Sequence, residues 1–125
     1  MITLHIAQVL AGLVGVGIIV IGIRFLIQPA ACADGFGVAI APAPGVNGYL
    51  ATKAVRDIAS GLFIFALLVL ASTQVVGVFL LLASLIAFGD MGIVLRNGGK
   101  PAVAFGVHGA TGAVIVVAGL LFLLA

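Results

Sequence analysis

Charged residues are scarce in this chain of 125 residues: they make up 6% of it, with five Lys or Arg, three Asp and no Glu. A soluble domain carries about a quarter charged residues, so this composition excludes a soluble globular domain and a disordered chain. Five scattered basic residues do not form a basic surface, so no nucleic-acid partner is expected. The single cysteine, Cys32, excludes an internal disulfide and a cysteine-built redox or metal site.

Apolar residues, in contrast, make up 65% of the chain. A helix needs about 20 mostly apolar residues to cross a bilayer core of about 30 Å. Stretches of this kind are predicted at residues 4–27, 50–71, 75–95 and 102–124. We therefore expect an all-α integral membrane protein, with residues 1–125 forming a single four-helix transmembrane bundle whose surroundings are the lipid bilayer.

The connections between the predicted spans differ in length and character. Residues 72–74 are barely a turn, which forces the second and third spans into an antiparallel hairpin. Residues 29–49 form a long connection that is rich in glycine and proline and also apolar. Gly and Pro interrupt a continuous helix there, so we expect a long interfacial loop folded over the mouth of the bundle.

The basic residues indicate how the bundle is oriented. All of them lie toward the two longer connections, and none lies toward the termini: Arg24, Lys53, Arg56, Arg96 and Lys100. Cytoplasmic loops carry an excess of Lys and Arg, so we expect both termini outside and both longer loops in the cytoplasm. Lys53 and Arg96 are interpreted as topology anchors, and the expected location is a bacterial inner (plasma) membrane.

Polar side chains within the spans lie at similar depth. Ionisable residues in transmembrane segments are rare and usually face the interior of the bundle. At 1.5 Å per residue, six of them lie within roughly 10 Å of the cytoplasmic helix ends: Arg24, Lys53, Arg56, Asp57, Asp90 and His108. Because consecutive spans run in opposite directions, these side chains fall in one layer. The predicted ligand-binding residues of this layer are Arg24, Arg56, Asp57, Asp90 and His108.

The charges of this layer do not balance in the sequence. Its cytoplasmic end counts four basic residues against two aspartates: Arg24, Lys53, Arg56 and Arg96 against Asp57 and Asp90. An unpaired charge at mid-depth costs about 2.5–3.5 kcal/mol, so both aspartates should have partners. We expect Asp57 to pair with Arg24 or Arg56. Asp90 is expected to pair with Arg96 or with the histidine of the last span.

Excess positive charge favours an anionic or carbonyl-bearing ligand, which in a membrane would be amphipathic: a lipid, a quinone or an isoprenoid-like metabolite. The same charge opposes a cation held by His108 and the aspartates, so no metal is expected. No glycine-rich phosphate loop is present, and no cofactor is expected.

Two other functions fit the same residues. In a small membrane enzyme, Asp57 or Asp90 would act as the acid and His108 as the base on a lipid-soluble substrate. In a non-catalytic membrane subunit or scaffold, the charges would only clamp the helices together. Small residues such as Gly15, Gly22 and Gly61 allow helices to pack closely, as in a bundle, a homo-oligomer or a complex with a membrane partner. The sequence does not decide whether the protein is an enzyme.

Several of these residues also carry a family resemblance. The run Gly22-Ile23-Arg24-Phe25-Leu26, with Pro29 and Phe36-Gly37, resembles the start of a small uncharacterised four-helix membrane family found in bacteria and fungi. Lys53-Ala54-Val55-Arg56-Asp57-Ile58 with Gly61 resembles its central motif, and Asp90 and His108 its later positions. The resemblance implies the four-helix fold but no activity. A looser likeness, in architecture, is to the DoxX-like membrane proteins, some of which serve near quinone redox chemistry.

Overall fold

The computed structural model describes residues 1–125, and all of its regular structure is helical. The elements in chain order are α1 (Ile2–Ile27), α2 (Pro29–Phe36), α3 (Val46–Leu70), α4 (Thr73–Arg96), α5 (Pro101–Val103), η1 (Ala104–Gly109) and α6 (Ala110–Leu124). The segment η1 is π-helical, and the backbone on both sides of it stays right-handed helical. Thus α5, η1 and α6 form one helix with a widened turn near its start.

Three helical segments are long and apolar enough to cross a membrane: Ile2–Ile27, Thr73–Arg96 and Pro101–Leu124. Helix α3 is 25 residues long but differs in composition, because every 18-residue stretch of it includes Lys53, Arg56 and Asp57. Many large apolar side chains on all the long helices are exposed, as expected where lipid replaces water. By its composition and helices, the chain is a small membrane protein.

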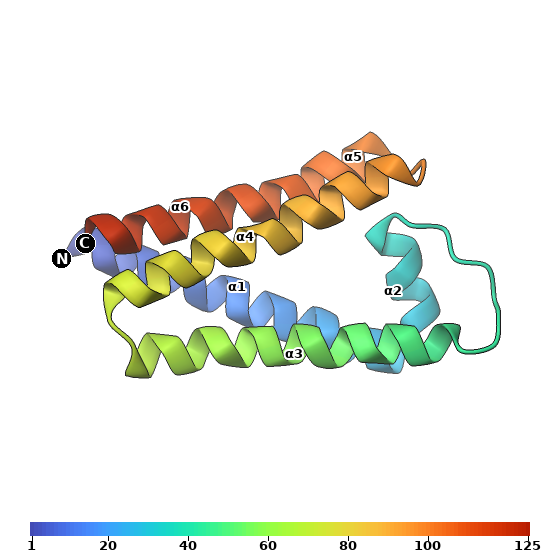
Figure 1. Cartoon of the computed structure of the whole chain (residues 1–125), viewed down its shortest axis with the longest axis horizontal. Helices are drawn as coiled ribbons and strands as arrows, with labels where there is room; N and C mark the ends of the chain where they lie inside the picture. Colours follow the sequence, from blue (N-terminus) through green and yellow to red (C-terminus); the bar gives the residue numbers. More distant parts are fainter.

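The long helices form two antiparallel pairs. Helix α1 packs along α3, α4 packs along α6, and α1 also contacts α6 (Figure 1). Helices α3 and α4 make few contacts: they meet near the turn that joins them and diverge toward the other end, where α2 stands (Figure 1). Both termini lie at the end of the molecule that holds this turn. The end where the pairs diverge, with α2 and α5, is called the wide end below.

Each pair is held by a close approach of backbones. A Cβ atom on Gly61 of α3 would lie 2.7 Å from the carbonyl oxygen of Gly15 in α1. In the second pair, a Cβ atom on Gly77 of α4 would lie 2.9 Å from the carbonyl oxygen of Gly119 in α6. Neither position can hold a larger residue without moving a helix. The close packing predicted for the small residues of α1 and α3 is confirmed at these contacts.

The connection after α1 is more regular than predicted, because its first eight residues form α2. Proline is tolerated at the first position of a helix, where its missing N–H is not needed, so Pro29 starts α2. The alanines that follow favour the helix, and Gly37 ends it with a left-handed φ of 103°. Only residues 37–45 remain irregular before α3, which begins at Val46.

Candidate functional site

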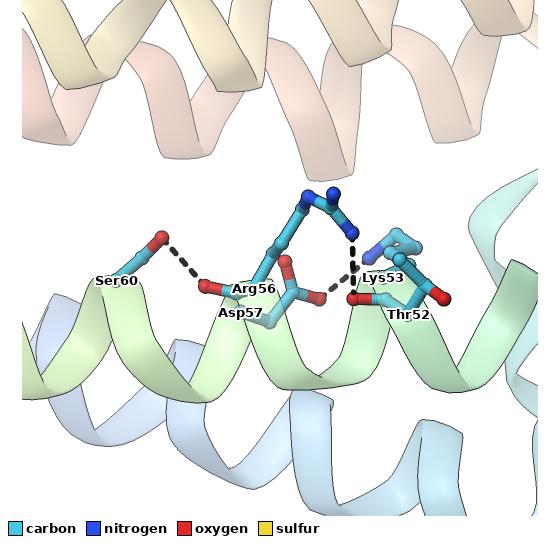
Figure 2. A network of polar contacts seen from close by, with 5 residues as sticks. All are labelled: Thr52, Lys53, Arg56, Asp57 and Ser60. Atoms are coloured by element: carbon cyan, nitrogen blue, oxygen red, sulfur yellow. Dashed lines mark hydrogen bonds and ion pairs between the residues drawn. The ribbon is translucent and has the colours of Figure 1, made fainter.

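Lys53 of α3 connects three helices at the wide end. Its Nζ atom lies 2.6 Å from Oδ2 of Asp57, one turn further along α3 (Figure 2). The same ammonium lies 4.2 Å from the ring centroid of Phe25 in α1 and 5.2 Å from that of Phe36 in α2. An ammonium over an aromatic face is attracted by the ring's electron density. Lys53 therefore holds the start of α3, the end of α1 and α2 together.

His108 connects α2 to the last helix. Its side chain is buried, its Nε2 atom lies 2.8 Å from the carbonyl oxygen of Phe36, and the two ring centroids are 4.4 Å apart. Because a carbonyl oxygen can only accept, Nε2 must carry the proton in this hydrogen bond. The residue lies in η1, and π-helical turns are frequent at functional sites. Phe36 thus contacts both Lys53 and His108.

Asp90 lies on α4 toward the same end of the chain's helix pairs, and Lys53, Asp57, Asp90 and His108 are together called the cluster below. Its side chain is partly buried in the last third of an apolar helix. Asp90 shares a face of α4 with the buried Ala87 and Val94, and α4 packs against η1, which carries His108. Asp90 nevertheless has no ion pair within 4.0 Å and no hydrogen bond to the protein. Asp90 and His108 therefore lie on two elements that contact each other, and Asp57 lies on α3 in the half that is near the same end of the molecule.

The two arginines predicted for the site are placed differently. Arg56 points from α3 toward α4 and α6, as does Asp57 (Figure 2). Its guanidinium is exposed and donates one hydrogen bond of 3.3 Å to the carbonyl oxygen of Thr52. Arg24 is exposed on α1 and makes no ion pair or side-chain hydrogen bond with the other predicted residues. Arg56 thus belongs to the edge of the cluster, whereas Arg24 stands apart.

The predicted ion pairs of the aspartates were wrong. Asp57 pairs with Lys53 rather than with Arg24 or Arg56, because a lysine four residues earlier reaches it along the same helix face. Arg96 is six residues from Asp90, which places it on a different face of α4. His108 has its Nε2 atom turned to the carbonyl of Phe36 instead.

These contacts also change where the charge of the layer lies. Lys53 and Arg56 balance Asp57 and Asp90 within the cluster. The excess positive charge predicted from the sequence resides in Arg24 and Arg96, both exposed near helix ends.

Sequence reasoning missed the structural roles of Lys53, Phe25 and Phe36. The sequence pattern favours a topology anchor at Lys53, although this residue shares a helix face with Asp57. The connection after α1 is apolar, but its apolar character alone does not predict that one of its aromatic rings reaches the cluster. An aromatic residue in a connection too apolar for solvent was the available signal for Phe36.

A separate cavity of about 320 Å³ lies between α2, residues 40–43 and the start of α3. It is lined mainly by apolar side chains, with Asp34 and Asn47 as polar members. None of the predicted site residues lines it.

Comparison with known proteins gives one match. Searches of curated proteins and of solved structures return nothing similar to the chain, and neither supports the looser likeness to the DoxX-like proteins. A family model does match, over residues 15–122. This range contains all five predicted site residues as well as Phe25, Phe36 and Lys53. Because the match covers most of the chain, the protein belongs to the family described as domain of unknown function DUF4267.

Proposed function

We propose that this protein is a four-span integral membrane protein that binds the headgroup of an amphipathic ligand at its wide end. The binding residues are Lys53, Arg56, Asp57, Asp90 and His108, named the polar layer from here on. The ligand is a lipid, a quinone or an isoprenoid-like molecule, with an anionic or carbonyl oxygen directed to Arg56.

The path of α3 supports the fourth span. At 1.5 Å per residue its 25 residues extend about 38 Å, more than the bilayer core of about 30 Å. It lies alongside α1, so it covers the same depth as a helix that is long and apolar enough to span (Figure 1). Its charged residues all lie in its first half, near the wide end, where water and headgroups are within reach.

The distribution of basic residues supports the orientation. The basic residues all lie near the wide end, away from the termini. The positive-inside rule then places the wide end in the cytoplasm and both termini outside, in a bacterial inner membrane.

The single observation that carries the ligand proposal is Asp90, an acidic residue inside an apolar helix without a partner in the protein. If the charges served only to clamp helices, each would be expected to have a partner. An unpaired charge inside a span costs about 2.5–3.5 kcal/mol on insertion scales. A ligand that contacts Asp90 would supply the missing partner and offset this cost.

The test is native mass spectrometry of the full chain released from nanodiscs, with the bound mass identified. We expect one small amphipathic molecule per chain, and its loss in Asp57→Asn and Asp90→Asn. Asp34→Asn is the matched control, because Asp34 is exposed on α2 and outside the polar layer. A folded wild-type protein without any such molecule would contradict the proposal.

A second candidate function is the non-catalytic membrane subunit or scaffold, which the Lys53–Asp57 pair and its ring contacts favour. In that case the same spectra would show a bound protein chain and no small molecule.

Topology is tested with single cysteines in a Cys32→Ser background. Four spans require Thr3→Cys and Ser72→Cys to react with an impermeant thiol reagent from outside and Asn97→Cys from inside. If α3 does not cross the membrane, Thr3→Cys and Ser72→Cys will react from opposite sides.

A further inference from the structure

Free hydrogen-bond donors of the polar layer lie on α3 alone. Nε2–H of His108 donates to the carbonyl of Phe36, and the hydroxyls of nearby Ser60 and Thr111 donate to backbone carbonyls of their own helices. On α3, Lys53 donates one of its three N–H groups to Asp57, and Arg56 donates one of its five to the carbonyl of Thr52. The remaining N–H groups of these two residues make no hydrogen bond within the protein.

Acceptors in the same layer are free. Both carboxyl oxygens of Asp90, Oδ1 of Asp57 and Nδ1 of His108 have no hydrogen-bond partner in the protein. No fully buried side-chain nitrogen or oxygen in the chain lacks a partner, so these atoms must each be reachable from outside the protein. The case of His108 is the most specific, because its side chain is only 8% exposed. Its free ring nitrogen is therefore presented through a small opening.

The free acceptors of Asp90 and His108 define what a ligand must bring to α4 and η1. A buried or partly buried acceptor left without a donor costs free energy, and a donor on the ligand removes that cost. The histidine and the aspartates are not close enough together for three of them to hold one metal ion.

From this inventory we infer that the ligand's headgroup carries a hydrogen-bond donor, a hydroxyl or a protonated amine, directed to Asp90 and to Nδ1 of His108. This inference rests on the proposed function and adds a second contact to it. The donor binds between α4 and η1, while an acceptor oxygen of the same headgroup faces Arg56 on α3.

The test uses amphiphiles that share one alkyl chain and differ only in the headgroup: hexadecylamine, hexadecanol, methyl hexadecanoate and hexadecanoate. Each is titrated into the full chain in a mild detergent, and bound adducts are counted by native mass spectrometry. We expect the amine and the alcohol to bind about tenfold more tightly than the methyl ester, which has acceptors only. Asp90→Asn should remove about tenfold of the affinity for the amine, whereas Asp34→Asn should leave it unchanged.

The outcomes separate the two proposals. If the ester or the carboxylate binds as tightly as the amine and the alcohol, the donor inference is overturned while the amphiphile site stands. Amine binding that is equally insensitive to Asp90→Asn and Asp34→Asn also overturns it. If no member of the series forms a stoichiometric adduct with folded protein, the proposed function itself fails. Circular dichroism of both variants establishes that they are folded.

Discussion

The Nε2 atom of His108 lies 2.8 Å from the carbonyl oxygen of Phe36, although 72 residues separate the two in the chain. Their rings are tilted by 53° with centroids 4.4 Å apart. The Phe36 ring also lies 5.2 Å from the ammonium of Lys53. One residue of the short helix α2 therefore contacts both helix pairs of the bundle at the end where they diverge.

Removing the His108 side chain should loosen α2. In His108→Ala the carbonyl of Phe36 loses its donor and the ring loses its neighbour, so we expect amide hydrogen exchange in residues 30–37 to accelerate about tenfold. Hydrogen-exchange mass spectrometry in nanodiscs measures this. His5→Ala is the control, since His5 is exposed near the N-terminus at the opposite end. Unchanged exchange in α2 would show that other contacts hold it in place.

The Lys53–Asp57 pair should show strong coupling in a double-mutant cycle. Lys53→Met leaves Asp57 without its partner in a partly buried position and should lower the free energy of unfolding by about 1–3 kcal/mol. The double variant Lys53→Met/Asp57→Leu should recover most of this loss, because it removes both charges. Reversible unfolding in mixed detergent micelles measures the free energy of unfolding of the single and the double variants. Lys100→Met, exposed in a loop, should have little effect. A double variant as unstable as the sum of its single variants would refute the coupling.

Gly61→Ala should weaken the α1–α3 pair. The added Cβ atom would lie 2.7 Å from the carbonyl oxygen of Gly15, which is backbone and cannot rotate away. Overpacking of this kind costs about 1–3 kcal/mol. Gly12→Ala on α1 is the matched control, since nothing lies within 4 Å of a Cβ atom there. Equal thermal stability of the two variants would mean that the helices separate without cost.

Asp90→Asn should stabilise the ligand-free protein while weakening ligand binding. The carboxyl group has no partner in the protein, so replacing it with an uncharged amide of similar size relieves the cost of an unpaired charge in an apolar helix. We expect the midpoint of thermal unfolding to rise by a few degrees, about 1 kcal/mol in stability. Residues kept at the expense of stability are typical of functional sites. A fall in the midpoint would favour a structural clamp instead.

Apolar runs and charge placement predict much of this fold and part of its site. Long apolar stretches predict the long helices, although three charged residues interrupt α3, and the depth of Asp57, Asp90 and His108 in alternating helices predicts that all three lie toward one end of the bundle. Helix α2 could not be predicted in this way, because eight residues between Gln28 and Gly37 have no span-like length. The role of Lys53 depends on the rings of Phe25 in α1 and Phe36 in α2, whose centroids lie 4.2 Å and 5.2 Å from its ammonium. That arrangement is tertiary and leaves no periodic trace in the sequence.

The widened turn at residues 104–109 has a consequence for how this helix tolerates changes in length. A π-helical turn holds about one residue more than an α-helical turn over a similar rotation, so it absorbs an extra residue without turning the helix on either side of it. Deleting Gly106, where an added Cβ atom would meet nothing within 4 Å, would convert the turn to α-helix and leave Pro101–Val103 on the same side of the helix. Val103 would keep its place beside Gly37, and the α4–α6 contact at Gly119 would stay in register. A deletion in the α-helical part of α6 would instead rotate the two ends of this helix by about 100° against each other.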